Sequence, residues 1–210
     1  MAKAETLLWL ADTAPLGADW FAAGLGWLND AERLRHERFA RAERRRQFVA
    51  GRILLRMALA ELLGVAPCAV ALTERPGNAP ALAFPEQPGL GLSISHSGQW
   101  VACAVSLTGP VGLDIERIDP ARDVLAIAEQ AFGPEEAGQL KVLEATARAD
   151  AFYRMWCRYE AHIKLGGKGV HDIFHAFPGL ALVLSSMAAL DVEPAMIDLR
   201  GVHSRAEATR

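Results

Sequence analysis

Apolar or small residues recur at helical spacing in two long stretches of the chain. In the first stretch they stand three or four positions apart, at Phe48, Gly51, Leu55, Leu59 and Leu62. This period predicts a helix over about residues 44–63 that ends at Gly64, because glycine is favoured just after a helix. The second stretch repeats the pattern at Phe152, Trp156, Tyr159 and Ile163. It predicts a helix that ends at the glycine pair 166–167.

Alternation of apolar and polar residues predicts strands in other parts of the chain. Val111, Leu113 and Ile115 alternate with other residues, so residues 111–116 are expected to form a half-buried strand. The remaining strand candidates are a hairpin of residues 92–95 and 100–107 that turns at 97–99, a starting strand at 6–10, and one or two strands within 173–184.

Capping and turn residues place the elements between these. Asn29 or Asp30 is suited to cap a helix that follows it. Closely spaced prolines and glycines predict turns and loop over residues 72–91. A further helix is expected over residues 121–132, whereas the pattern fades after residue 191.

Composition narrows the class of protein. The chain has 210 residues, of which 51% are apolar and 22% charged, as in a soluble globular protein. This length allows one large domain or two smaller ones. The net charge of −3 gives no overall attraction to nucleic acid or to an anionic membrane.

The cysteines and the first residues indicate a compartment. Cys68, Cys103 and Cys157 are far apart and lack the spacing of metal ligands. We expect them to serve as small apolar residues in a reducing environment. The N-terminus lacks the layout of a signal peptide, and no apolar run is long enough to span a bilayer. The sequence therefore predicts a cytoplasmic protein with no membrane segment.

Three acidic residues and a lysine form the most informative pattern. Asp114 and Glu116 are two positions apart on the predicted strand, so they share one face, away from the apolar set. Glu160 and Lys164 are four apart on the predicted helix and therefore neighbours. Three carboxylates could hold Mg²⁺, which prefers oxygen ligands, and the lysine would suit a phosphate leaving group. The ordinary alternative is a solvated strand face and a surface ion pair.

A basic stretch precedes the first long helix. Residues 41–46 read Arg-Ala-Glu-Arg-Arg-Arg. They could form a solvated helix face with a few ion pairs. They could also clamp a phosphate, because a guanidinium binds phosphate through two parallel hydrogen bonds. Nucleic-acid binding is disfavoured, since no aromatic residues are interleaved and the net charge is negative.

The hairpin turn carries another polar group. His96 is flanked by Ser95 and Ser97. It could be an exposed polar residue, or it could donate to a phosphate oxygen. A Ser/His/Asp triad with Asp114 is conceivable, but no Gly-x-Ser-x-Gly pattern surrounds the serines. Hydrolytic nucleophile chemistry is therefore discounted.

Four short segments, in order along the chain, carry recognisable motifs. They are Gly-Arg-x-x-x-Arg at 51–56, Ser-His-Ser-Gly-x-Trp at 95–100, Gly-Leu-Asp-Ile-Glu at 112–116, and Trp-x-x-x-Glu-Ala-x-x-Lys at 156–164, with glycines at 166 and 169. Taken together they resemble the 4'-phosphopantetheinyl transferases of the surfactin-synthetase-activating type, over roughly residues 39–170. One such motif alone would be weak evidence, but four in order are hard to ascribe to chance.

The resemblance implies a fold and a reaction. The implied fold is α+β, with two similar halves related by a pseudo-twofold axis, here an N-terminal half over residues 1–110 and a C-terminal half over residues 111–210. The part after Lys168 is short, which leaves room for a trimmed or irregular C-terminal half. The implied reaction moves 4'-phosphopantetheine from coenzyme A to a serine of an acyl or peptidyl carrier protein and releases adenosine 3',5'-bisphosphate.

The resemblance also implies site residues. Asp114, Glu116 and Glu160 correspond to Mg²⁺ ligands, Glu160 also to a general base, and Lys164 to the group that meets the phosphates and the leaving group. Ser95 and His96 correspond to contacts with coenzyme A phosphates. We expect Arg41 or Arg46 to hold the ribose 3'-phosphate. The family's usual lysine in Gly-Lys-Pro is replaced here by Asn78, for which Arg75 could substitute.

Two hypotheses about function follow from these residues and motifs. The first is a Mg²⁺-dependent transferase that acts as a monomer on coenzyme A and an apo carrier protein, in fatty-acid, polyketide or nonribosomal-peptide synthesis, with no nucleic-acid or membrane partner. The second is a degenerate, non-catalytic module that binds coenzyme A or a carrier protein. Tyr159 stands where the family has a lysine before the helix glutamate, and this departure leaves the second hypothesis open.

Overall fold

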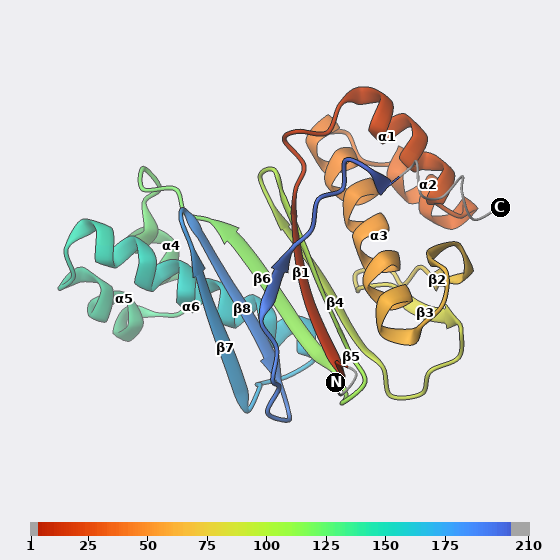
Figure 1. Ribbon diagram of the computed structural model, residues 1–210. Helices are drawn as coiled ribbons and strands as arrows, with labels where there is room; N and C mark the ends of the chain where they lie inside the picture. The colour runs from red at the N-terminus through yellow and green to blue at the C-terminus, as the bar shows by residue number, and fades with distance from the viewer. Residues whose placement is uncertain (1–3, 203–210) are drawn as a thin grey trace.

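The computed structural model describes residues 4–202 and shows a mixed α+β protein (Figure 1). The helices are α1 (Ala18–Gly24), α2 (Asp30–Glu37), α3 (Ala42–Leu63), α4 (Val124–Ala131), α5 (Pro134–Lys141) and α6 (Ala145–Leu165), with 3-10 turns at Leu25–Trp27 and Pro67–Ala69. The strands are β1 (Thr6–Asp12), β2 (Ala71–Thr73), β3 (Ala81–Phe84), β4 (Gly91–Ser97), β5 (Trp100–Ser106), β6 (Val111–Arg117), β7 (His171–Phe177), β8 (Leu180–Ser186) and β9 (Pro194–Met196). The α+β class implied by the sequence is confirmed.

The two main sheets lie between two groups of helices. One sheet has the strand order β4-β5-β1-β9 and the other β6-β8-β7, while β2 and β3 pair separately. In Figure 1, α4, α5 and α6 cover the outer side of the second sheet, and α3 covers the outer side of the first. Apolar residues of both sheets, including Leu10, Ala104 and Leu113, pack between them in one buried cluster. β4 and β6, each at the edge of its sheet, lie against one another.

The long helices form as their sequence patterns predict. α3 ends at Gly64, which has the positive φ of 72° that glycine adopts without steric cost. Its buried positions include Phe48, Leu55 and Leu59, which pack on the first sheet. Asn29 caps α2 in a capping box, because its side chain accepts the Glu32 N–H and the Glu32 side chain accepts the Asn29 N–H. These predictions are confirmed.

Three segments differ from the sequence-based expectation. The 72–91 region, predicted as turns and loop, contains the short antiparallel pair β2–β3. The helix expected over 121–132 begins at Val124, because Asp123 caps it by accepting the Ala126 N–H. Strand β9, which the fading pattern did not indicate, pairs parallel with β1. Three residues pairing on a sheet edge leave almost no periodic signal, since strand patterns need four or more residues.

The division into halves at residues 110 and 111, and the pseudo-twofold relation between them, stay predictions.

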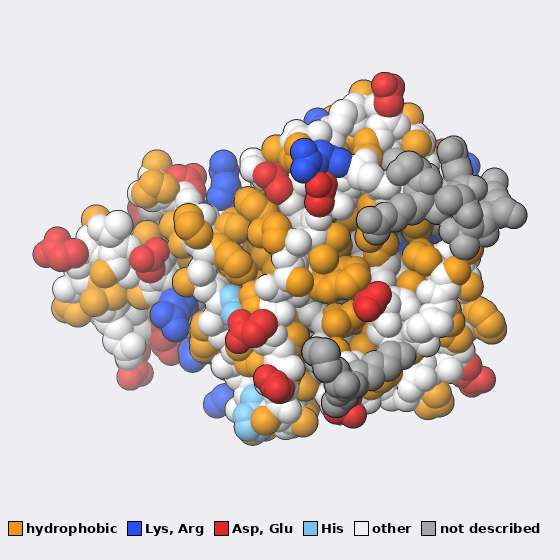
Figure 2. All heavy atoms as spheres, in the orientation of Figure 1, with side chains coloured by type: hydrophobic (Ala, Val, Ile, Leu, Met, Phe, Trp, Pro, Cys, Tyr) orange, Lys and Arg blue, Asp and Glu red, His pale blue; other side chains and the backbone are white. Residues whose placement is uncertain are grey.

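Charge is spread over the face seen in Figure 2, where lysine and arginine side chains stand apart from one another and gather into no basic patch. Among residues 4–202, no helix is both long enough and apolar enough to cross a bilayer.

Candidate functional site

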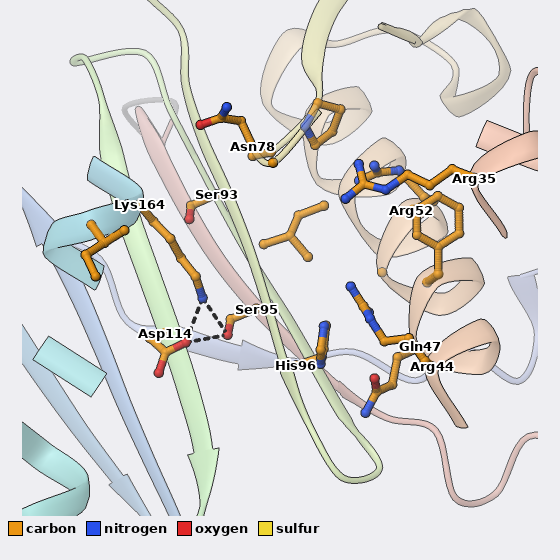
Figure 3. A pocket seen from close by; sticks show the side chains of 17 residues that line it. Arg35, Arg44, Gln47, Arg52, Asn78, Ser93, Ser95, His96, Asp114 and Lys164 are labelled. Carbon is orange, nitrogen blue, oxygen red and sulfur yellow. Dashed lines mark hydrogen bonds and ion pairs between the residues drawn. The ribbon is translucent and has the colours of Figure 1, made fainter. Parts of the chain in front are cut away.

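A cleft of about 410 Å³ opens where α3, β4, β6 and α6 meet. We call it the sheet-seam cleft. Arginines of α2 and α3 form one wall, and Ser95, Asp114 and Lys164 form the other (Figure 3). His96 and the loop at residues 77–80 also line it. The cleft is therefore lined by arginines on one side and by Lys164 with a buried carboxylate on the other.

Close packing of α6 on β6 brings Lys164 into this cleft. A Cβ atom at Gly112 would lie only 1.9 Å from the carbonyl oxygen of Ala161, so a larger residue at this position would push the helix away. With glycine there, Lys164 Nζ donates to Asp114 Oδ1 at 2.6 Å and to Ser95 Oγ at 3.0 Å. Gly112 thus permits contacts between residues that are 50 and 69 positions apart.

Asp114 is buried, with 4% of its surface exposed. Its Oδ1 accepts hydrogen bonds from Ser95 Oγ at 2.7 Å and from Lys164. Its Oδ2 is buried and has no hydrogen-bond partner among the described residues. The alternative of a solvated strand face does not hold at Asp114, because α6 covers it. The alternative of a surface pair between Glu160 and Lys164 does not hold either, since Lys164 pairs with Asp114.

Glu116 lies two residues further along the same face of β6. Ser97 Oγ donates to its Oε2 at 2.6 Å. Burial, and then the neighbouring charge of Asp114, raise the pKa of Glu116, although the Ser97 hydrogen bond opposes this. Beneath them, burial and the charges of Asp114 and Glu116 raise the pKa of the Cys157 thiol, which stays protonated. The β6 pair is therefore a site of concentrated negative charge.

Glu160 stands one turn before Lys164 on α6 and is half-buried. Within residues 4–202, no group of three or more His, Cys, Asp and Glu side chains is arranged so that it could hold a metal ion. The structure thus brings Asp114 and Glu116 to one strand face but does not bring Glu160 into a three-carboxylate group with them.

His96 is half-buried and points toward the arginine wall (Figure 3). Burial, and then the positive charges of Arg44 and Lys164, lower its pKa to about 4. At neutral pH the ring is therefore uncharged and can donate a single N–H to an anion in the cleft.

The arginines expected from the basic stretch lie in different places. Arg41 lines an adjoining hollow together with Arg44 and His96. Arg46 lies elsewhere: it donates to the Leu16 carbonyl at 2.8 Å and its guanidinium stands 4.5 Å from the centre of the Phe21 ring. The expectation that Arg46 reaches the ligand is not supported by this position. Two residues along a helix are a rotation of about 200°, so residues 44 and 46 lie on nearly opposite faces of α3.

Arg75 was expected to replace a missing lysine, but the structure gives it a different contact. Its Nε donates to the Ala79 carbonyl at 2.9 Å, so it braces the 77–80 loop. It is absent from the residues that line the cleft, whereas Asn78 is among them. Arg75 therefore shapes the rim of the cleft, and its expected role as a substitute for the lysine is not supported.

Three arginines that the sequence analysis did not name individually as ligand contacts line the cleft, one of them within the basic stretch 41–46. They are Arg35, Arg44 and Arg52. Arg44, Phe48 and Arg52 are spaced four apart on α3, and this spacing could have placed them on one face. Arg35 comes from α2, which no local pattern connects to the cleft.

Two glutamates, one fully buried and one half-buried, hold part of this wall. Glu32 is fully buried and receives both terminal nitrogens of Arg56, at 3.0 and 2.6 Å. Arg52 Nε lies 3.2 Å from Glu32 Oε1 without hydrogen-bond geometry, and its Nη2 donates to Glu74. Glu74 also pairs with Arg35 at 2.5 Å. The two glutamates thus hold Arg35 and Arg52 beside each other at the cleft.

Comparison with known proteins gives consistent matches over most of the chain. Residues 13–108 match a family model described as 4'-phosphopantetheinyl transferase, N-terminal, and residues 110–194 match the 4'-phosphopantetheinyl transferase superfamily. The chain is 34% identical over 170 residues to the 4'-phosphopantetheinyl transferase HetI of Nostoc sp., covering 80% of this chain and 70% of that protein. It is 28% identical over 156 residues to the 4'-phosphopantetheinyl transferase Sfp of Bacillus subtilis, covering 74% and 67%.

Other relatives are matched over a smaller share of their length. A relative from Synechocystis sp. is 32% identical over 143 residues, which cover 68% of this chain and 58% of that protein. A 4'-phosphopantetheinyl transferase of Bacillus subtilis is 33% identical over 133 residues, covering 63% and 57%. The chain thus spans a little over half the length of these two curated relatives.

Proposed function

This chain belongs to the 4'-phosphopantetheinyl transferase superfamily, and we propose that it moves 4'-phosphopantetheine from coenzyme A to a serine of an acyl or peptidyl carrier protein. The observation that carries the proposal is the sheet-seam cleft, where Lys164 and a buried carboxylate face arginines across one cavity. Phosphoryl transfer is catalysed mainly by positioning and by charge stabilisation. A cleft with cations on both walls suits a ligand that carries several phosphates.

The carboxylates of β6 fit a divalent cation. Asp114 Oδ2 is buried without a hydrogen-bond partner, and the charge of Asp114 contributes to the raised pKa of Glu116. A cation between two such groups would satisfy the first and favour the charged form of the second. Asp114 and Glu116 are the residues that would hold Mg²⁺. When bound, this ion supplies a positive charge to phosphate oxygens.

The chain's own residues provide the rest of the chemistry. Glu160 takes the proton of the carrier serine as a general base. The serine oxygen then bonds to the phosphorus that carries the pantetheine group. The bond from that phosphorus to the oxygen bridging to the second phosphate breaks, and adenosine 3',5'-bisphosphate leaves. Lys164 Nζ neutralises the charge that grows on the leaving oxygen.

The positive groups around the cleft bind the donor. The neutral ring of His96 donates to a coenzyme A phosphate, and Arg41 in the adjoining hollow holds the ribose 3'-phosphate. Ser95 lines the cleft beside them and gives its hydroxyl hydrogen to Asp114. Bidentate hydrogen bonds from a guanidinium suit this group. We expect the protein to work as a monomer in the cytoplasm. The free thiols at Cys68, Cys103 and Cys157 agree with a reducing compartment.

The test is a transfer assay read by intact mass. The chain is incubated with coenzyme A, Mg²⁺ and an apo carrier protein, and a parallel reaction contains a chelator. We expect the carrier to gain the mass of one phosphopantetheine only when the metal is present. A carrier that gains no mass, under conditions in which a known transferase modifies it fully, would contradict the transferase proposal.

A non-catalytic module that binds coenzyme A or a carrier protein is the second candidate. The replacement of the family's lysines by Asn78 and Tyr159 favours it. Asn78 lines the cleft, and Tyr159 is 45% exposed against Phe132. Calorimetric binding of coenzyme A without any mass gain on the carrier would support this candidate over the enzyme.

A further inference from the structure

Two edge strands from different sheets meet without pairing through their backbones. β4 ends the first sheet and β6 begins the second. Three backbone N–H groups of β6 donate to serine hydroxyls of β4: Leu113 to Ser93 at 3.0 Å, Ile115 to Ser95 at 3.3 Å, and Arg117 to Ser97 at 3.0 Å. We call these three contacts the serine seam. The serines are two residues apart, so they share one face of β4.

Serine suits this seam because its hydroxyl accepts and donates together. Ser97 Oγ accepts the Arg117 N–H and donates to the Glu116 carboxylate at 2.6 Å. Ser95 Oγ accepts the Ile115 N–H and donates to Asp114 at 2.7 Å. Each of these two serines therefore fixes a β6 carboxylate and the backbone just after it.

Ser93 makes the same backbone contact but holds no carboxylate. It accepts the Leu113 N–H, and the residue before Leu113 is Gly112, which has no side chain. Ser93 is 2% exposed, so it is as much a part of the buried seam as Ser95 at 5%. The chain thus offers an internal comparison between a serine that only joins the sheets and serines that also orient an acidic group.

We propose that Ser97 is a positioning residue that orients the Glu116 carboxylate for a divalent cation, while Ser93 only joins the two sheets. Ser95 orients the Asp114 carboxylate in the way that Ser97 orients Glu116, and its hydroxyl also accepts a hydrogen bond from Lys164 Nζ. Hydrogen bonds to a ligating carboxylate restrict its rotamers and so lower the entropy lost on binding. The proposal rests on the proposed function in one respect only, that Asp114 and Glu116 are cation ligands.

The test compares Ser97→Ala with Ser93→Ala. Mn²⁺ is titrated into each full-length protein without coenzyme A or carrier, and free Mn²⁺ is measured by electron paramagnetic resonance. Loss of a hydrogen-bond partner to a metal ligand commonly weakens binding on the order of tenfold or more, so we expect the Mn²⁺ Kd of Ser97→Ala to rise by about that factor. Ser93→Ala should keep the wild-type Kd, although both variants lose a seam contact and melt at a lower temperature.

Ser97→Thr is the conservative rescue. Threonine keeps the hydroxyl and is well accepted in strands, so its Mn²⁺ Kd should return toward the wild-type value. Equal Kd values for Ser97→Ala and Ser93→Ala would overturn the proposal, because the serines would then act only on the fold.

Crystal structures of the two alanine variants give a measurement that does not depend on metal. We expect the Glu116 carboxylate to leave its position beside β4 in Ser97→Ala and to keep it in Ser93→Ala. An unmoved Glu116 in Ser97→Ala would overturn the proposal. If the wild-type protein binds no Mn²⁺, the metal part of the proposed function fails, and these structures alone decide the positioning role of Ser97.

Discussion

The two walls of the sheet-seam cleft differ in how their buried carboxylates are paired. On the arginine wall, fully buried Glu32 lies within ion-pair distance of both Arg52 and Arg56. On the other wall, Asp114 is nearly as buried, yet one of its oxygens has no partner among the described residues and Glu116 adds a second negative charge beside it. In the first arrangement the glutamate is matched by arginine charges within the protein, although Arg52 Nε makes no hydrogen bond, and the pairing supports the fold. The second is left incomplete, as expected where a ligand supplies the missing charge.

The comparison predicts that substitutions in the arginine wall mainly lower the free energy of unfolding. In Glu32→Ala, Arg56 and Arg52 lose a buried counter-charge. Removing one partner of a buried ion pair typically costs about 3–5 kcal/mol of unfolding free energy. Chemical denaturation should show a loss of that size. Glu37→Ala, on the exposed side of the same helix, is the matched control and should change stability by no more than about 0.5 kcal/mol. A Glu32→Ala protein as stable as Glu37→Ala would remove the contrast between the walls.

Substitutions in the wall formed by Ser95, Asp114 and Lys164 should mainly lower the turnover number. Lys164 neutralises the leaving group in the proposed reaction, an interaction that is strongest in the transition state. Preorganised charge of this kind is commonly worth about 2.7–4 kcal/mol, so Lys164→Ala should lower kcat on the order of a hundredfold or more. Lys164→Arg should restore only part of this loss, since a planar guanidinium does not take the place of a compact ammonium. Turnover of Lys164→Ala within a few-fold of wild type would assign this lysine to the fold alone.

Lys164→Ala also tests the contrast between the two walls through the free energy of unfolding. A surface helix pair contributes only about 0.3–0.5 kcal/mol. Lys164 instead pairs with the buried Asp114, so Lys164→Ala should cost more than this in a denaturation experiment. In an Asp114→Asn background the cost should shrink, because the buried charge that needs the lysine is then absent. An equal cost in both backgrounds would show that the pair contributes no coupling energy.

Arg41 and Arg46 test whether one short basic stretch contributes both to ligand binding and to the stability of the fold. Arg41 lines the hollow that adjoins the cleft, whereas Arg46 donates to the Leu16 carbonyl and stacks over Phe21. A hydrogen bond to a charged group is worth about 1.5–3 kcal/mol, so Arg41→Ala should raise the KM for coenzyme A about tenfold or more. Dephospho-coenzyme A, which lacks the 3'-phosphate, should show little change in KM. Arg46→Ala should lower the melting temperature and leave both KM values unchanged, and the reverse pattern would exchange the two assignments.

His96 gives the smallest expected effect, a change in the pH dependence of stability. Its folded-state pKa of about 4 lies below the ordinary value of 6.5, so the unfolded chain binds more protons between these pH values. Stability contributed by the neutral ring is therefore fully present above pH 6.5 and is lost as the pH falls toward 4. Glu116, with a raised pKa, has the opposite dependence. The difference in melting temperature between wild type and His96→Gln should isolate the histidine, and a pH-independent difference would contradict its burial as a neutral ring.

Patterns within a few residues were enough to predict the framework. The spacing of apolar positions and a following glycine determined α3, and alternation determined β6, because helix and strand periods are local properties. The strand period also placed Asp114 and Glu116 on one face. Short motifs singled out Ser95, His96, Asp114 and Lys164, and these four side chains all line the sheet-seam cleft.

Only the tertiary structure decided which of these residues meet and how deeply they are buried. Whether Lys164 pairs with Glu160 or with Asp114 depends on how closely α6 packs on β6, and Gly112 controls that approach. Which arginine of the basic stretch reaches the cleft depends on the face that α3 turns toward β4. The serine seam exists because two sheet edges meet there, so a backbone N–H on one strand finds a side-chain acceptor on the other. The sequence determined the local elements and their candidate chemistry, whereas long-range packing determined burial and pairing, since both depend on residues distant in the chain.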